Sequence, residues 1–133
     1  GGGSIPTFLA QAVEGCEVDV VELEPSVLRV AEEAMGFRAG PRLRVTIGDG
    51  ASFARQLGRG FGASGGAAAF GGPYDAVLVD AYDALDVMPP DLRGRGGLES
   101  GLAGGLLREG SGVVCVNLLS RAEVGAALEA FGG

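Results

Sequence analysis

The chain has 133 residues, of which 26 are glycine, and its 17 acidic against 10 basic residues give a net charge of −7. A domain this acidic is a poor candidate for nucleic-acid binding through phosphate contacts, whereas a cationic substrate such as an amine suits it. The chain contains no histidine, which excludes Ser-His-Asp, Cys-His and histidine–metal chemistry.

The two cysteines, Cys16 and Cys115, lie far apart and outside any C-x-x-C motif, so no metal or redox site is expected. Cys115 lies within an apolar run and is predicted to be a buried small hydrophobic residue. No apolar stretch is long enough to span a membrane, and no secretory signal is visible. We therefore expect a soluble, cytoplasmic protein with neither a nucleic-acid nor a membrane partner.

Strands and helices alternate in the first third of the chain. Residues Ile5–Val13 are predicted to form a helix, and Glu17–Glu22, which is short, β-branched and apolar at alternate positions, a strand. A second helix is predicted over Pro25–Met35, with its apolar residues on one face. Pro25 suits the first helical turn and Gly36 the end of the helix.

The same alternation continues to the end of the chain. A strand at Leu43–Ile47 leads through the turn Gly48-Asp49-Gly50 to a short helix at Ala51–Leu57, and a Gly/Ala-rich surface loop is predicted at 58–72. The strand Tyr74–Asp80 has the apolar centre Ala76–Val79, which is typical of a parallel strand covered on both faces. The remaining predicted elements are an irregular segment, a helix, a buried strand and an amphipathic helix, at Asp83–Arg95, Leu98–Leu107, Gly112–Leu118 and Arg121–Phe131.

Repeated strand–helix units predict parallel strands joined by right-handed crossovers, and hence an open, doubly wound α/β sheet of the Rossmann type. The glycines Gly1–Gly3 would be expected between a strand and a helix, and the chain supplies only the helix. We therefore expect residues 1–133 to be a partial domain that lacks its first and last strands. Unpaired strand edges would make it poorly stable or oligomeric, for instance a homodimer.

The first candidate site combines Gly1-Gly2-Gly3-Ser4 with Glu22. Glycines allow a ligand to approach the backbone closely, and the following helix N-terminus adds partial positive charge. Glu22 ends the next strand, 19 positions after Gly3, where a carboxylate can accept hydrogen bonds from ribose hydroxyls. The alternative is a flexible N-terminal segment. Pro6 stands at the third glycine position of G-x-G-x-x-G, which disfavours a pyrophosphate ligand.

Two further groups of carboxylates follow strands. Asp49, beside Gly50, could bind an adenine amino group or form a plain Asp-Gly turn. Asp80 and Asp83 leave the next strand and could converge on an amine, one of them acting as a base, with Tyr82 lining the pocket; the alternative is an acidic, solvated loop. Asn117 ends the last strand, where it is interpreted as a satisfied polar residue at a strand terminus.

The order and spacing of four motifs resemble the spermidine synthase-like group of class I methyltransferases. These motifs are Gly1-Gly2-Gly3-Ser4-Ile5-Pro6, Val20-Val21-Glu22-Leu23-Glu24-Pro25, Ile47-Gly48-Asp49-Gly50 and Tyr74-Asp75-Ala76-Val77-Leu78-Val79-Asp80. Within that group, Met35-Gly36-Phe37, Pro89-Pro90 and Val116-Asn117-Leu118 look most like the carboxyl-terminal domain of the methyltransferases that modify elongation factor 1-alpha on lysine and on its amino terminus.

The resemblance implies S-adenosylmethionine (SAM) as cofactor and a protein or small-molecule amine as methyl acceptor. The implied cofactor-binding residues are Gly1, Gly2, Gly3, Glu22, Leu23, Asp49, Gly50 and Asp80, and the implied catalytic residues are Asp80 and Asp83. Methyl transfer requires no metal. Two alternatives remain: an aminopropyltransferase that uses decarboxylated SAM, since Asp80-x-x-Asp83 resembles the paired aspartates of those enzymes, and a non-catalytic, truncated relative.

Overall fold

The computed structural model describes residues 1–60, 73–83, 85, 87–92 and 106–131. The chain divides into two compact units, Gly1–Gly50 and Ala51–Gly133, and each has a small hydrophobic core of its own. Most of the predicted helix Leu98–Leu107, and positions 61–72 of the predicted loop, lie outside the described residues.

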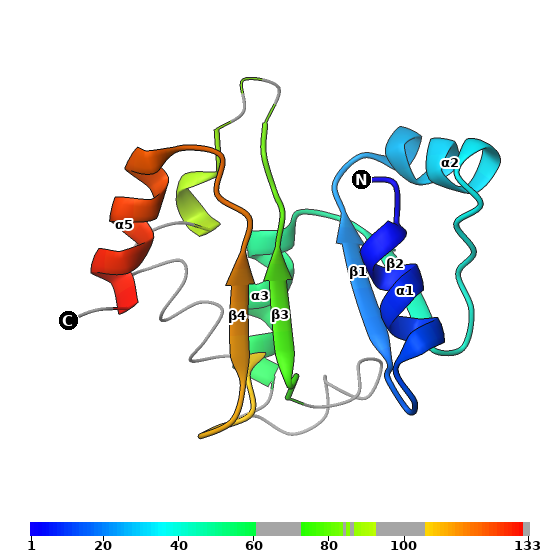
Figure 1. The fold of residues 1–133 in the computed structure, drawn as a ribbon, viewed down its shortest axis with the longest axis horizontal. Helices are drawn as coiled ribbons and strands as arrows, with labels where there is room; N and C mark the ends of the chain where they lie inside the picture. Colours follow the sequence, from blue (N-terminus) through cyan, green and yellow to red (C-terminus); the bar gives the residue numbers. More distant parts are fainter. Residues whose placement is uncertain (61–72, 84, 86, 93–105, 132–133) are drawn as a thin grey trace. The chain divides into compact units, whose positions relative to one another are not determined.

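The first unit contains two helices and two parallel strands. In chain order they are α1 (Ser4–Ala12), β1 (Val18–Glu22), α2 (Pro25–Ala34) and β2 (Leu43–Ile47). The strands pair in parallel from Val18↔Leu43 to Glu22↔Ile47. Figure 1 shows α1 running along the β1–β2 pair, with α2 beside the carboxyl end of β1. All four elements were predicted from the sequence, with bounds that differ by no more than one residue.

The core of the first unit is made by α1, α2, the segment after α2 and the start of β2. Its buried members are Ala10, Ala31, Phe37 and Leu43, each at most 6% exposed. Two of the four are alanines, one on each helix, and such small side chains allow a helix to pack closely. Phe37 supplies the largest side chain, so this one ring carries much of the apolar burial of the unit.

An ionic cluster joins the two strands of the first unit on their polar face. Arg44 lies opposite Asp19 in the parallel register, and its Nε donates to Asp19 Oδ1 at 2.6 Å while its guanidinium also donates to Glu17 Oε2 at 2.8 Å. The Asp19 side chain is only 5% exposed. These carboxylates, Asp19 foremost, raise the pKa of Arg44 above its usual range, and the cross-strand ion pair stabilises the register of the strands.

The second unit is built around the parallel pair β3 (Ala76–Val79) and β4 (Val113–Val116). Helix α3 (Gly50–Gly60) leads into it, a single 3₁₀ turn follows β3 at Pro90–Leu92, and α5 (Arg121–Phe131) follows β4. In Figure 1, α3 lies behind β3 and β4. Helix α3 continues through Gly60, so the prediction that the loop begins at residue 58 was wrong by three residues.

Among the residues that the structure describes, one face of the β3–β4 pair is covered and the other is exposed. Val77 and Val79 alternate with exposed neighbours and pack against the core cluster that includes Ala51 and Ala54 of α3. On the opposite face Leu78 is 48% exposed and its register partner Cys115 is exposed too. The predictions that Ala76–Val79 is buried on both faces and that Cys115 is buried were therefore wrong, because side chains of a strand alternate between its faces and, among the described elements, helices pack on one of the two.

None of the helices within the described residues is long and apolar enough to cross a membrane.

Candidate functional site

The residues predicted to form the site fall into two groups, one in each unit. The first unit holds the predicted cofactor residues Gly1, Gly2, Gly3, Glu22, Leu23, Asp49 and Gly50. The second unit holds Asp80, which was predicted to bind both the cofactor and the amine, and Asp83, which was predicted to act on the amine. That the two groups converge on one crevice stays a prediction.

Glu22 and the glycine segment meet in the first unit, as the sequence predicted. Glu22 Oε2 accepts a hydrogen bond from the Gly1 nitrogen at 2.8 Å, and its Oε1 accepts one from the Glu24 N–H at 3.1 Å. The Gly48 N–H donates to the Glu22 carbonyl at 2.9 Å and ties the ends of β1 and β2 together. The Glu22 carboxylate therefore lies at the carboxyl edge of this strand pair, beside the start of α1.

The charge of Glu22 is maintained by these contacts. Partial burial by itself raises the pKa of the Glu22 carboxyl, but the hydrogen bonds that it accepts from the Gly1 nitrogen and from the N–H groups of Glu24 and Leu23 outweigh this effect, so the pKa is lowered. A side chain that is 19% exposed and ionised at neutral pH can accept hydrogen bonds from a ligand that carries hydroxyl groups.

The glycines make close contact with Met35 and Phe37, which the sequence analysis did not assign to the site. Gly3 caps α1 with a φ of 76°, and a Cβ atom at Gly3 would overlap the Phe37 ring. A Cβ at Gly2 would lie 2.5 Å from Met35 Cε, whereas Gly1 has open space around it. The glycines at positions 2 and 3 thus admit two apolar side chains against the backbone. The sequence signal that could have indicated these contacts is the Met35-Gly36-Phe37 motif.

Three large apolar side chains near Glu22 are exposed to solvent. Leu23 follows it directly and is 60% exposed, Ile47 is its register partner on β2 and is 44% exposed, and Met35, which contacts Gly2, is 59% exposed. Apolar side chains beside a carboxylate suit a ligand that combines a flat ring with hydroxyl groups. Asp49 lies two residues after Ile47 and immediately before α3, where an aspartate commonly caps a helix.

In the second unit, the ends of β3 and β4 are joined by side chains. Asp80 follows β3, and its Oδ1 accepts a hydrogen bond from Asn117 Nδ2 at 2.8 Å. The Asn117 N–H donates to the Val79 carbonyl at 2.9 Å. The hydroxyl of Tyr82 donates to the Asn117 carbonyl and accepts from the Leu119 N–H at 3.2 Å. Asn117 is therefore a satisfied polar residue at a strand end, as predicted, and its partner is the carboxylate assigned to the site.

Asp83 shapes its own loop. Its Oδ1 accepts hydrogen bonds from the Leu85 N–H at 2.8 Å and the Val87 N–H at 3.0 Å. Its own N–H donates to the Val87 carbonyl at 3.0 Å. An aspartate that bonds the backbone ahead of it in this way is a common turn former, so one of its two carboxylate oxygens already has a structural function. Its catalytic role stays a prediction.

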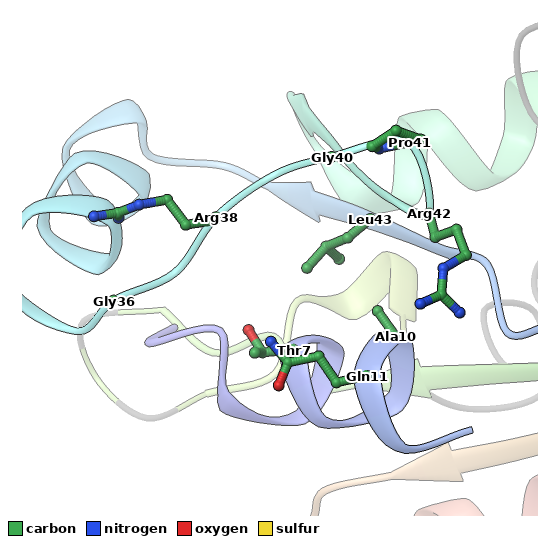
Figure 2. A pocket seen from close by; sticks show the side chains of 9 residues that line it. All are labelled: Thr7, Ala10, Gln11, Gly36, Arg38, Gly40, Pro41, Arg42 and Leu43. Carbon is green, nitrogen blue, oxygen red and sulfur yellow. The ribbon is translucent and has the colours of Figure 1, made fainter. Parts of the chain in front are cut away.

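A pocket of about 290 Å³ lies in the first unit, between α1 and the segment that leads into β2. Figure 2 shows Thr7 and Gln11 on α1 and, across the pocket, the chain from Gly36 to Leu43. The predicted cofactor residues do not line it. Among the residues that the structure describes, no three His, Cys, Asp or Glu side chains are grouped as a metal site would require.

No protein-family model matches the chain. It is 50% identical over 50 residues to the eEF1A lysine and N-terminal methyltransferase of Danio rerio (38% of this chain, 7% of the relative) and 37% identical over 81 residues to that of Homo sapiens (60% and 10%). It is 29% identical over 124 residues to the polyamine aminopropyltransferase of Vibrio vulnificus (93% and 37%).

A solved structure matches almost the whole chain. Human methyltransferase-like protein 13 in complex with SAH is 28% identical and superposes with a TM-score of 0.75 over 99% of this chain and 56% of that one. The chain spans between 7% and 37% of the length of the curated relatives named here.

The fold and the sequence together define the class: the chain has the α/β fold of class I SAM-dependent methyltransferases, as predicted from its motifs. Within that class its sequence is similar to the eEF1A lysine and N-terminal methyltransferases and, over a longer stretch but at lower identity, to an aminopropyltransferase. The resemblance stated from the sequence is thereby confirmed.

Proposed function

We propose that this chain is the SAM-binding part of a methyltransferase that modifies a protein amine, either a lysine side chain or an amino terminus. The observation that supports the proposal is the Glu22 carboxylate at the carboxyl end of β1, whose side chain is 19% exposed and whose Oε1 accepts a hydrogen bond from the Glu24 N–H at 3.1 Å. An acidic residue at the end of the strand that follows a glycine segment and its helix is the arrangement used for nucleoside cofactors, in which the carboxylate accepts hydrogen bonds from the ribose.

The residues present fit such a cofactor. The ionised Glu22 offers acceptors for two ribose hydroxyls, and the exposed Leu23 and Ile47 offer apolar surface for the adenine ring. The similar human protein was solved in complex with SAH, S-adenosylhomocysteine, which is the product of methyl donation by SAM.

When bound, SAM supplies an electrophilic methyl group on a sulfonium sulfur. The chain then has to orient the acceptor amine, exclude water and accept one proton as the nitrogen–carbon bond forms. Asp80, exposed at the end of β3 and bonded through one oxygen to Asn117, is suited to bind the amine and receive that proton. Leu23, Asp49, Gly50 and Asp83 remain proposed members of this site, in the roles expected from the sequence.

Aminopropyl transfer is the second candidate, since the Vibrio vulnificus aminopropyltransferase matches 93% of the chain. In that reaction Asp80 and Asp83 would hold a polyamine together. The turn bonds from Leu85 and Val87 to Asp83 leave this residue less free than Asp80 for such a role, and they favour methyl transfer with Asp80 as the base. A cytoplasmic location and a homodimer remain parts of the proposal.

Isothermal titration calorimetry of the full-length protein with SAM and with decarboxylated SAM tests the proposal. We expect SAM to bind, and Glu22→Ala to weaken it about a hundredfold, since two hydrogen bonds to a charged group are lost. Glu24→Ala is the matched control: it removes the same charge two residues away, and its binding should equal the wild type. Preference for decarboxylated SAM would favour aminopropyl transfer, and binding of neither by the folded protein would support a non-catalytic relative.

Transfer itself is measured with tritiated SAM and purified eEF1A as the acceptor, with putrescine as the alternative acceptor. Label on eEF1A that is lost in Asp80→Ala supports the proposed reaction. Label on neither acceptor, from a protein that binds SAM, would contradict the proposed acceptor class.

A further inference from the structure

We infer that Asn117 is a positioning residue that holds the Asp80 carboxylate in place for the acceptor amine, and that Tyr82 in turn holds Asn117. The inference rests on the proposed function for its catalytic meaning, but the network itself consists of hydrogen bonds within the second unit.

The Asn117 amide orients Asp80 without cancelling its charge. Asn117 Nδ2 donates to Oδ1 at 2.8 Å, and its backbone is held by the Val79 carbonyl at 2.9 Å, so donor and acceptor sit on the ends of two paired strands. An arginine or lysine in this position would neutralise the carboxylate, whereas an amide is a neutral donor. Within the part of the chain that the structure describes, Oδ2 of Asp80 has no hydrogen-bond partner, which leaves it open to a substrate amine.

Tyr82 ties the loop after β3 to the segment after β4. Its hydroxyl donates to the carbonyl of Asn117 and accepts from the N–H of Leu119. Burial raises the pKa of Tyr82, as do the nearby charges of Glu123 and Asp80, although the bond from Leu119 opposes this. The phenol therefore keeps its proton and remains a donor to Asn117 at neutral pH.

The anchor of this network is the first turn of α5. Glu123 Oε2 accepts from the backbone N–H groups of Leu119 and Ser120, both at 3.1 Å. The Ser120 hydroxyl accepts from the Glu123 N–H at 3.2 Å. This reciprocal pair is a capping box. Leu119 is thus shared between the capping box and Tyr82, and the contacts run from a helix terminus through Tyr82 and Asn117 to Asp80.

A carboxylate on an exposed loop loses efficiency as a base when it samples several rotamers, because transfer requires the reacting atoms within a narrow range of geometry. One hydrogen bond to a charged group is equivalent to roughly a tenfold to hundredfold change in an equilibrium. We expect Asn117→Ala in the full-length protein to lower kcat/KM for eEF1A about tenfold or more, with the SAM dissociation constant within about twofold of wild type. Tyr82→Phe should have a smaller effect in the same direction.

The double variant shows whether Asn117 acts through Asp80. If it does, Asn117→Ala combined with Asp80→Ala has the same rate as Asp80→Ala alone. Asp75→Asn is the matched control: it removes a carboxylate that bonds Arg108 at 2.6 Å at the other end of the same strand, and its rate should equal the wild type. An unchanged rate in Asn117→Ala, or independent losses in the double variant, would overturn the inference.

A second readout does not depend on turnover. The carboxyl ¹³C chemical shift of Asp80 reports its hydrogen bonding, and we expect it to move in Asn117→Ala, to move less in Tyr82→Phe and to stay constant in Asp75→Asn. A constant shift in Asn117→Ala refutes the positioning role. A wild type that transfers no methyl group, but shows the expected shifts, would instead refute the proposed function and leave the contact established.

Discussion

Replacing Gly3 with alanine would act on the backbone and on the core of the first unit at once. Gly3 has a φ of 76°, a conformation that costs an L-residue roughly 1–2 kcal/mol. The added Cβ would also overlap the ring of Phe37, which is only 3% exposed and has little room to move. Overpacking of this kind costs roughly 1–3 kcal/mol, so the two effects together predict a loss of about 2–5 kcal/mol in the free energy of unfolding.

Two other glycines separate the two contributions. Gly15 has a φ of 72° and open space around it, so Gly15→Ala should show the backbone cost of about 1–2 kcal/mol alone. Gly40 has neither a positive φ nor a neighbour within reach of a Cβ, and its alanine variant should stay within about 0.5 kcal/mol of wild type.

The assay is urea unfolding of the full chain, followed by far-UV circular dichroism, with the midpoint and slope fitted for each variant. In a double-mutant cycle, Phe37→Leu should relieve part of the cost of Gly3→Ala, by about 1 kcal/mol. If Gly3→Ala is no more destabilising than Gly15→Ala, or if the cycle shows no coupling, the packing argument for Gly3 is refuted.

Three further predictions concern charges and caps. Because folding lowers the pKa of Glu22, the ionised carboxylate stabilises the folded state fully above the ordinary pKa of about 4.5, and this stabilisation is lost as the pH falls below it. The urea midpoints of wild type and Glu22→Gln should therefore converge at acid pH, and a constant gap between them would contradict this. Arg44→Met should cost about 1–2 kcal/mol because Asp19 is almost buried, whereas Arg55→Met, whose ion pair is exposed, should cost under about 0.5 kcal/mol. Ser120→Ala should cost about 1 kcal/mol by removing the cap of α5, seen as a lower Tm, and an unchanged Tm would rule out the cap.

Elements defined by local signals were predictable from the sequence. The bounds of β2 at Leu43–Ile47 and of α5 at Arg121–Phe131 are those expected from periodicity, because each pattern is contained in one segment. The proximity of the glycine segment to Glu22 was predicted as well, since a glycine turn before a helix and an acidic residue at the end of the next strand together form the usual nucleoside-binding arrangement.

Contacts between segments that are distant in the sequence were harder to predict. Nothing local in the chain indicates that Phe37 packs on Gly3, because the contact depends on the path that the chain takes after α2. Asn117 was recognised as a strand-end residue, but its pairing with Asp80 depends on the register of β3 and β4. Cys115 was misplaced because a continuous apolar run does not reveal which faces of a strand are covered.

The exposed thiol of Cys115 can report whether the exposed face of β3 and β4 is covered by another surface. Cys115 exposes a thiol there beside Leu78, and thiols react with iodoacetamide at a rate set by access and by thiolate content. In a Cys16→Ser background, that rate measures directly whether another surface covers this sheet. Slow alkylation would show that another surface covers this sheet face, and fast alkylation would show that the face is open to solvent.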